Sequence, residues 1–175
     1  MAEYIAVKEG NLSFISNDIS FEEAAMNEPA SVAIHAFKKS QIKPKDTVLI
    51  YGIETIGLIL AQLARAAGVS ETLKDCIENA GNFAKIICLG NPLKEMSLPQ
   101  NTYWKILRKK LSLIGVWNSC FSEKENDWKD AITALKAGKI DLKSLITHRF
   151  SLSDYKKAFE IMKEKKKCIA KLCLR

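Results

Sequence analysis

Residues Asp46 to Gly68 read DTVLIYGIETIGLILAQLARAAG, and this stretch decides the fold of the chain. Its first part, Thr47–Tyr51, is a short run of β-branched, apolar and aromatic residues, which is typical of a buried parallel strand. Gly52 and Gly57 follow, and apolar residues then recur at helical spacing until Gly68 provides a C-terminal stop. The order strand, glycine turn, helix predicts a phosphate-binding loop, because the first turn of a helix presents free N–H groups to an anion.

The dinucleotide-binding fingerprint, G-x-G-x-x-G, requires a third glycine between these two. Here the turn reads Gly52-Ile53-Glu54-Thr55-Ile56-Gly57, so a glutamate takes the middle position. A side chain at that position blocks the approach of a pyrophosphate to the backbone, and its negative charge repels the phosphates. The sequence therefore predicts that Gly52 forms the turn, that Gly57 allows close packing of helix on strand, and that dinucleotide affinity is severely weakened.

The composition is that of a soluble globular protein, with 175 residues, 47% hydrophobic and 27% charged. No apolar run approaches the roughly 20 residues needed to span a bilayer, and the start MAEYIAVKEG lacks the layout of a signal peptide. The five cysteines form no C-x-x-C pair and no metal-ligand spacing. Scattered thiols favour a reducing compartment, so we expect a cytoplasmic protein.

The net charge of +7 raises the question of a polyanionic partner. Much of the excess lies in Lys105–Lys110 and Met162–Lys167, two segments that also have helical character. Basic helix faces are commonly just solvated, and no helix-turn-helix, zinc finger or aromatic-basic RNA motif accompanies them. We therefore expect no nucleic-acid and no membrane partner. An anionic small molecule fits the charge at least as well, and a basic anion or nucleic-acid binder stays an alternative.

Strands alternate with helices along the rest of the chain, which predicts an α/β fold with a mainly parallel sheet. The further strands expected are Ala2–Val7, Asn11–Ile15, Lys85–Leu89, Leu111–Trp117 and Cys168–Leu174, with a short extended piece at Leu145–Ile146. The further helices expected are Phe21–Met26 behind a Ser20 and Glu23 capping box, Ala30–Ser40 after an interruption at Pro29, Thr72–Ala80, Asn101–Leu107, Glu125–Ala137, and a last helix from Ser153 through Met162.

One element of the nucleotide-binding fold is expected to be missing. A full half-unit is βαβαβ, with an acidic residue about 20 positions after the glycines that binds the ribose hydroxyls. That distance from Gly52 leads to the neighbourhood of Thr72, inside an expected helix and with no second strand before it. The sequence thus predicts that both the acidic ribose ligand and its strand are absent.

Several runs resemble the zinc-containing medium-chain alcohol and polyol dehydrogenases. Tyr4-Ile5, the run NLSFISNDISFEEAAMNEPASVAIHA and the strand with its glycine turn are similar to the hinge and cofactor domain of that family. The second half is similar to the galactitol-1-phosphate 5-dehydrogenase subgroup through Trp117-Asn118-Ser119, Asn126-Asp127-Trp128 and the run ITHRF at residues 146–150. Nearly every residue of the chain falls within this resemblance.

The resemblance implies an incomplete Rossmann-like three-layer cofactor domain with a remnant of the GroES-like catalytic domain at the N-terminus. Residues 1–40 would be that remnant with its hinge helix, residues 41–150 a truncated NAD-binding domain, and residues 151–175 a helix and strand that return to the catalytic-domain side. Most of the catalytic domain and strands two to four of the nucleotide fold would have no counterpart. The strand Val48–Tyr51 would then have lost both neighbours and have open edges.

The family reaction implied is hydride transfer between NAD and a sugar-alcohol phosphate, with zinc as Lewis acid. Glu28 matches the family's glutamate at the catalytic zinc and is the single surviving candidate ligand, whereas such a zinc needs about three protein ligands. Asn91 and the strand at residues 115–117 match the part that holds the nicotinamide. His35 and His148 match no family zinc ligand and are expected to be packing or surface residues. No catalytic residue is then intact, and we expect the chain to be weakly active or inactive.

The strand Leu111–Trp117 pairs with its own copy across a two-fold axis in the family. The resemblance therefore implies a homodimer through this strand. A non-catalytic remnant that pairs with a full-length paralogue is the alternative to a free enzyme.

Overall fold

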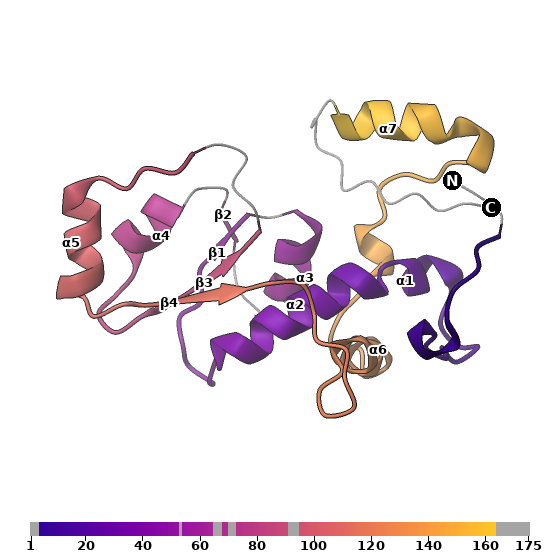
Figure 1. The fold of residues 1–175 in the computed structure, drawn as a ribbon, viewed down its shortest axis with the longest axis horizontal. Helices are drawn as coiled ribbons and strands as arrows, with labels where there is room; N and C mark the ends of the chain where they lie inside the picture. The colour runs from indigo at the N-terminus through magenta and orange to yellow at the C-terminus, as the bar shows by residue number, and fades with distance from the viewer. Residues whose placement is uncertain (1–3, 53, 65–67, 70–72, 91–94, 164–175) are drawn as a thin grey trace. The chain divides into compact units, whose positions relative to one another are not determined.

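The computed structural model describes residues 4–52, 54–64, 68–69, 73–90 and 95–163, and the chain forms two compact units (Figure 1). One unit is Glu28–Ile140, and the other combines both ends of the chain, Met1–Asn27 and Asp141–Arg175. The three-part division expected at residues 40 and 150 stays a prediction. No helix among the described residues is long and apolar enough to cross a membrane.

The larger unit is entered through α2 (Asn27–Ser40), whose inner face is buried. The buried side chains on it are small or branched, namely Ala30, Val32, Ala33, Ile34 and Ala36. The interruption expected at Pro29 does not occur, because the helix begins at Asn27 rather than at Ala30. Pro29 lies in the first turn, where a backbone N–H would have no helical partner, so the proline does not break the helix.

The opening stretch forms the unit β1 (Ile50–Tyr51), α3 (Thr55–Ala64) and β2 (Gly68–Val69). β1 is shorter than the predicted strand. The prediction that no second strand follows is wrong, because Gly68 begins β2 and pairs in parallel with Ile50. Gly68 therefore begins a strand and does not serve as the expected stop of the helix. The physical reason is that unpaired backbone groups at a sheet edge favour a partner, and even a two-residue strand supplies one.

A second parallel pair joins β3 (Lys85–Leu89) to β4 (Ser112–Val116), with Lys85 opposite Ser112 and Leu89 opposite Val116. The helices α4 (Leu73–Asn79) and α5 (Gln100–Arg108) contact each other, and buried Thr102 donates a hydrogen bond of 2.8 Å to Glu78. These elements confirm the predictions within one or two residues, with Thr72 outside the described residues.

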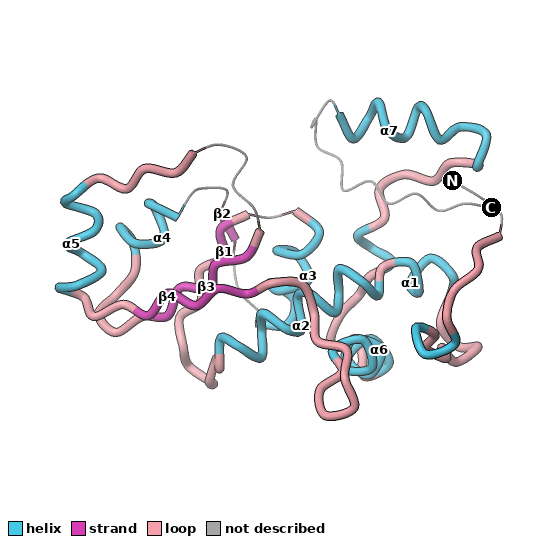
Figure 2. The backbone as a smooth tube through the Cα atoms, in the orientation of Figure 1, coloured by secondary structure: helices cyan, strands magenta, loops and turns pink. Residues whose placement is uncertain are grey.

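The strands form two separate two-stranded sheets, coloured magenta in Figure 2. The fold is therefore α/β with small parallel sheets. Along the described residues β2 is the one strand between β1 and β3 in the chain, and it pairs with β1. β1 thus has one neighbour, which corrects the expectation that it has lost both.

The unit built from the chain ends contains α1 (Phe21–Ala25) and α7 (Tyr155–Lys163), with short 3-10 turns at Glu9–Asn11, Lys143–Leu145 and Leu152–Asp154. The predicted capping box is confirmed, because Ser20 and Glu23 exchange side-chain and backbone hydrogen bonds at the start of α1. Both Arg149 guanidinium contacts to Glu22, at 2.7 and 2.9 Å, connect the two ends of the chain.

The strands predicted near the N-terminus are wrong for the described residues. Residues 4–7 and 12–15 form no strand, and residues 9–11 form a 3-10 turn. A strand needs a neighbour to pair with, and none of the described residues supplies one. Leu145 closes a 3-10 turn, so only Ile146 of the expected extended piece is extended. The predicted strand Cys168–Leu174 lies outside the described residues.

Candidate functional site

The two glycines between β1 and α3 have the conformations that their predicted structural roles require. Gly52 has a φ of +92°, a left-handed conformation that favours glycine. A Cβ added to Gly57 would lie 1.8 Å from the carbonyl oxygen of Gly52, so α3 packs on the turn only because that side chain is absent. Both predicted structural roles are confirmed.

Glu54 stands immediately before α3 and is exposed. Its carbonyl oxygen accepts the Leu58 N–H at 2.9 Å, so it closes the first turn of the helix. A carboxylate is favoured at a helix N-terminus, which is also where a pyrophosphate would bind. At about 4 Å, two like charges repel by roughly 1–4 kcal/mol at effective dielectric constants between 80 and 20. The glycines therefore fit a dinucleotide, and Glu54 does not.

Of the other residues predicted to bind the cofactor, Thr55 and Ile56 lie among the described residues. Thr55 and Ile56 form the half-buried first turn of α3. Ile53 and Asn91 lie outside the described residues, so their predicted contacts to NAD stay predictions. Gly90, which precedes Asn91, has a φ of +93° and ends β3 in a turn.

Glu28 is exposed in the first turn of α2. Its backbone oxygen accepts the Ser31 hydroxyl at 2.6 Å. Glu28 belongs to no group of three or more possible metal ligands in the part of the chain that the structure describes. Since a catalytic zinc needs about three protein ligands, the described residues do not fit zinc at this position.

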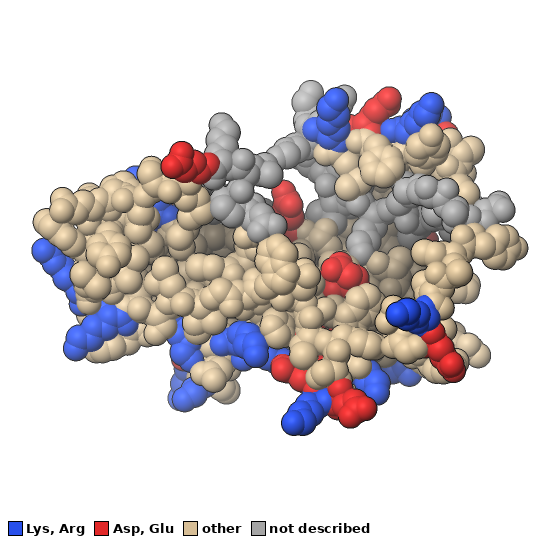
Figure 3. Space-filling model, viewed as in Figure 1, with Lys and Arg blue, Asp and Glu red and all other residues tan. Residues whose placement is uncertain are grey.

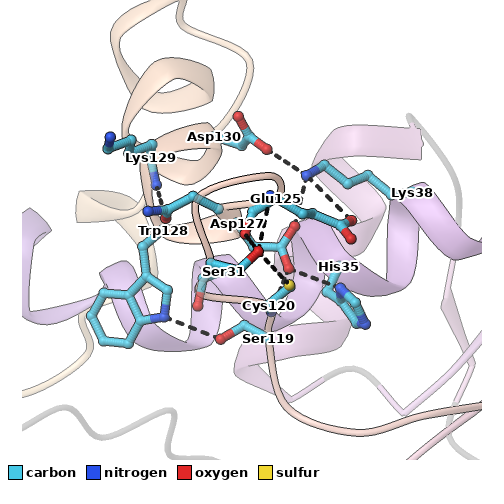
Figure 4. Close-up of polar contacts among 12 residues, drawn as sticks. Ser31, His35, Lys38, Ser119, Cys120, Glu125, Asp127, Trp128, Lys129 and Asp130 are labelled. Carbon is cyan, nitrogen blue, oxygen red and sulfur yellow. Dashed lines mark hydrogen bonds and ion pairs between the residues drawn. The ribbon is translucent and has the colours of Figure 1, made fainter. Parts of the chain in front are cut away.

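A different group of polar side chains comes together in the same unit (Figure 4). We call it the Asp127 cluster, and it consists of His35 and Lys38 from α2, Glu125 from the loop, and Asp127 and Asp130 from α6 (Asp127–Lys136). Asp127 is completely buried. One of its carboxylate oxygens contacts His35 Nδ1 at 2.8 Å and the backbone N–H of Cys120 at 2.6 Å, and the other accepts from Lys38 at 2.7 Å. Lys38 also pairs with Asp130.

The electrostatics of the cluster are those of a compensated ion pair. Burial by itself raises the pKa of Asp127, but hydrogen bonds from Lys38 and the Cys120 amide, together with nearby positive charge, leave that pKa below its ordinary value. Burial likewise lowers the pKa of Lys38, and the two aspartates outweigh it, so that pKa is raised. Both groups are held in their charged forms.

His35, Glu125 and Asp127 bring three possible metal-ligand atoms within 4.8 Å of one another. The Lys38 ammonium already lies among these carboxylates, 3.9 Å from Glu125 and bonded to Asp127 and Asp130. Lys38 thus supplies the cation that a metal would otherwise provide. The cluster is a structural link between α2 and α6, so His35 has a packing role, and the structure adds its hydrogen-bond partner, Asp127.

The sequence contained a signal for this link. His35 and Lys38 are three residues apart, as are Asp127 and Asp130, so each pair lies on one face of its helix. His148 has no comparable role. It is partly exposed, stacks on Phe150 at 6.0 Å between ring centroids and contacts Thr147, in agreement with the prediction.

A parallel strand–helix–strand unit with a glycine turn is typical of the α/β folds that include dinucleotide-binding domains. No family model matches the chain. Galactitol 1-phosphate 5-dehydrogenase of Escherichia coli K12 is 28% identical over 212 residues, which is 90% of this chain and 61% of that protein. The crystal structure of galactitol-1-phosphate dehydrogenase from Escherichia coli superposes with a TM-score of 0.85 at 26% identity, over 98% of this chain and 65% of that one.

An alcohol dehydrogenase of Escherichia coli CFT073, solved with NADH, has a TM-score of 0.78 at 21% identity over 95% of this chain and 63% of its own, a likeness that shows the fold alone. The chain is thus similar to medium-chain zinc-binding alcohol/polyol dehydrogenases. It spans about 61% of the length of the first relative. Because the 212 aligned positions exceed the 175 residues of the chain, that relative carries internal residues without a counterpart here.

Proposed function

We propose that the chain is a shortened form of an NAD- and zinc-dependent polyol-phosphate dehydrogenase, and that its 175 residues do not by themselves catalyse hydride transfer. The family reaction would oxidise a secondary alcohol of a sugar-alcohol phosphate. In support, a relative named for galactitol 1-phosphate aligns with 90% of the chain, and the net charge of +7 suits an anionic substrate.

The observation that carries the proposal of inactivity is Glu54 in the glycine turn. Gly52 has the left-handed φ and Gly57 has the close approach to Gly52 that such a loop uses, and an exposed glutamate lies between them at position 54. Glu28 adds to this, since the described residues bring no set of zinc ligands around it. When bound, zinc would polarise the substrate oxygen and NAD would accept the hydride, and neither group has a complete site among these residues.

The direct test measures the activity of the purified chain. We expect no NAD⁺ reduction with galactitol 1-phosphate above background, with full-length Escherichia coli galactitol 1-phosphate 5-dehydrogenase as the positive control. Turnover within about tenfold of that control, at ordinary rates of about 1–1000 s⁻¹, would contradict the proposal.

A dimer through the strand Leu111–Trp117 is the second part of the proposal. β4 pairs with β3 on one side, and no other described strand pairs with it. Leu113 and Trp117 are exposed beside that edge. An open edge with apolar side chains favours association, and a second copy of the same strand gives a closed two-fold interface. This same edge is where the alternative, a full-length paralogue, would bind.

Light scattering after size exclusion tests this interface. We expect a dimer that Leu113→Lys converts to a monomer, because a buried lysine at an edge opposes pairing. Phe159→Lys, an exposed site in the other unit, is the matched control and should leave the dimer intact. A wild-type monomer at all concentrations would contradict the proposal.

We expect no nucleic-acid partner. On the face shown in Figure 3, the Lys and Arg side chains of the described residues are separated by uncharged surface and mixed with acidic ones. Binding of single-stranded or duplex nucleic acid normally uses a continuous basic groove or stripe. A salt-dependent shift of labelled RNA or DNA by the chain would contradict this expectation.

A further inference from the structure

The Asp127 cluster already holds one cation between acidic side chains of the larger unit. The Lys38 ammonium donates to Asp127 at 2.7 Å and to Asp130, and it lies 3.9 Å from Glu125 (Figure 4). Three carboxylates therefore converge on one positive charge. Burial by itself would lower the pKa of Lys38, yet that pKa is raised, so the position stabilises a cation.

The cluster also brings together donors of the two kinds that first-row divalent metals bind. His35 offers an imidazole nitrogen, and Glu125 and Asp127 offer carboxylate oxygens, all within 4.8 Å of one another. Ligand atoms about 2.0–2.2 Å from one ion lie at most about 4.4 Å apart. The three atoms are thus within a few tenths of an ångström of the spread that one ion requires. Glu125 lies in a loop and its side chain is 38% exposed, so it can move that far.

We propose that the Asp127 cluster is a divalent-cation site that the Lys38 ammonium keeps closed. Its ligands are His35, Glu125 and Asp127, and Asp130 becomes available as a fourth when Lys38 leaves. One imidazole with several carboxylates suits Mn²⁺, Zn²⁺ or a similar ion. The site is separate from Glu28, which belongs to no such group among the described residues.

Charge and mobility both favour the exchange of one cation for another. The three carboxylates carry three negative charges and Lys38 neutralises one of them, whereas a divalent ion neutralises two. Lys38 reaches the carboxylates through a flexible four-carbon chain that is 34% exposed, so its ammonium can swing into solvent. Asp127 is completely buried and is therefore the fixed ligand. A buried carboxylate needs a compensating charge, so the metal replaces the ammonium and the site is never emptied.

Titration of the full chain with Mn²⁺ tests the proposal. Mn²⁺ prefers oxygen and nitrogen ligands, so the five cysteines compete for it less than they would for Zn²⁺. The variant Lys38→Met removes the competing ammonium and keeps an unbranched side chain. We expect it to bind one Mn²⁺ at least about tenfold more tightly than the wild type, measured by loss of the EPR signal of the free ion. Bound Mn²⁺ should also broaden the NMR signal of the Cys120 amide, which donates to Asp127.

Two further variants make the test specific. Lys157→Met removes the same charge from an ion pair in the other unit, where Lys157 contacts Asp154 at 2.9 Å. It should leave Mn²⁺ binding at the wild-type level. Adding Glu125→Gln to Lys38→Met removes one ligand from a partly exposed position, and it should weaken Mn²⁺ binding at least about tenfold.

Two results of the titration overturn the proposal. One is a Lys38→Met variant that binds Mn²⁺ no more tightly than the wild type or Lys157→Met. The other is tight binding that Glu125→Gln leaves unchanged, because the ion then lies elsewhere.

Circular dichroism covers the case in which Lys38→Met does not fold without metal. Refolding of this variant by Mn²⁺ supports the site, because a metal that binds only the folded chain stabilises it, and a chain that stays unfolded overturns the proposal. The titration contains no NAD and no substrate, so inactivity of the chain does not bear on its result.

Discussion

The glycine turn and the Asp127 cluster stabilise the same unit in opposite ways. The turn depends on missing side chains, since Gly52 has a φ of +92° and a Cβ on Gly57 would meet the Gly52 oxygen at 1.8 Å. The cluster depends on charged side chains that satisfy one another around buried Asp127. A backbone geometry can persist after its ligand is lost, because the packing of helix on strand still requires it. The retained glycines therefore indicate the fold, and they do not by themselves indicate a bound dinucleotide.

Replacing Asp127, the buried centre of the Asp127 cluster, should have the largest effect on stability. Asp127→Ala leaves the Cys120 amide and the Lys38 and His35 side chains without their buried partner, and we expect a loss of about 3–5 kcal/mol in the free energy of unfolding. Asp130→Ala removes a partly exposed partner of Lys38 and should cost less than about 1 kcal/mol. Urea unfolding of both variants measures the difference, and equal losses would contradict a central role for Asp127.

Adding a side chain at Gly57, where α3 packs on the glycine turn, should have the next largest effect on stability. Gly57→Ala places a methyl group against backbone that cannot move away cheaply, and we expect a loss of about 1–3 kcal/mol. Gly81→Ala is the matched control, because nothing lies within 4 Å of its added Cβ. If thermal unfolding found the two variants equally stable, the close approach of α3 to Gly52 would be wrong.

The pH dependence of the cluster follows from its pKa values. The folded pKa of Asp127 is below its ordinary 3.8, so its contribution to stability is present above that value and is lost as pH falls through the folded pKa. The pKa of Lys38 is raised above its ordinary 10.5, so its contribution to stability is present below pH 10.5 and is lost as pH rises through the folded pKa. The difference in unfolding free energy between wild type and Asp127→Asn should be flat between about pH 5 and 9 and shrink in stronger acid. A difference that grows with acidification would contradict this sign.

Of the substitutions considered, Glu54→Gly should have the smallest effect. It restores the third glycine of the fingerprint, but we expect NAD affinity to stay unchanged. β2 contributes only two residues beside β1, so little of the sheet that would carry the rest of the cofactor site is present among the described residues. We expect no measurable gain in NAD affinity by calorimetry, since a pyrophosphate turn holds only part of the cofactor. A gain to micromolar affinity would show that Glu54 alone prevents binding.

Much of the larger unit could be predicted from sequence because its signals are local. Lys85–Leu89 is a compact apolar run, and it forms β3 with the same bounds. The structural roles of Gly52 and Gly57 followed from a five-residue spacing. Glycine turns and apolar periodicity depend on residues that are neighbours in the sequence, so these elements can be predicted without knowing the tertiary contacts.

The wrong predictions concern segments whose secondary structure depends on a strand partner distant in the sequence. Residues 4–7 have strand composition but no described neighbour, so no strand forms, whereas Gly68 resembles a helix stop and becomes a strand beside β1. Pairing availability overrides propensity in both cases. The contact between His35 and Asp127 joins residues 92 positions apart. Spacing of three residues places each pair of polar side chains on one helix face, but no local pattern identifies the partner across such a separation.

We propose that the chain keeps the fold of its dehydrogenase relatives without the ability to bind the dinucleotide. Titration of the purified chain with NADH, followed by nucleotide fluorescence and by calorimetry, tests it most directly, with the full-length Escherichia coli enzyme as the positive control. We predict no saturation up to about 1 mM, which corresponds to a binding free energy weaker than about −4 kcal/mol. Saturable binding in the micromolar range would contradict the claim.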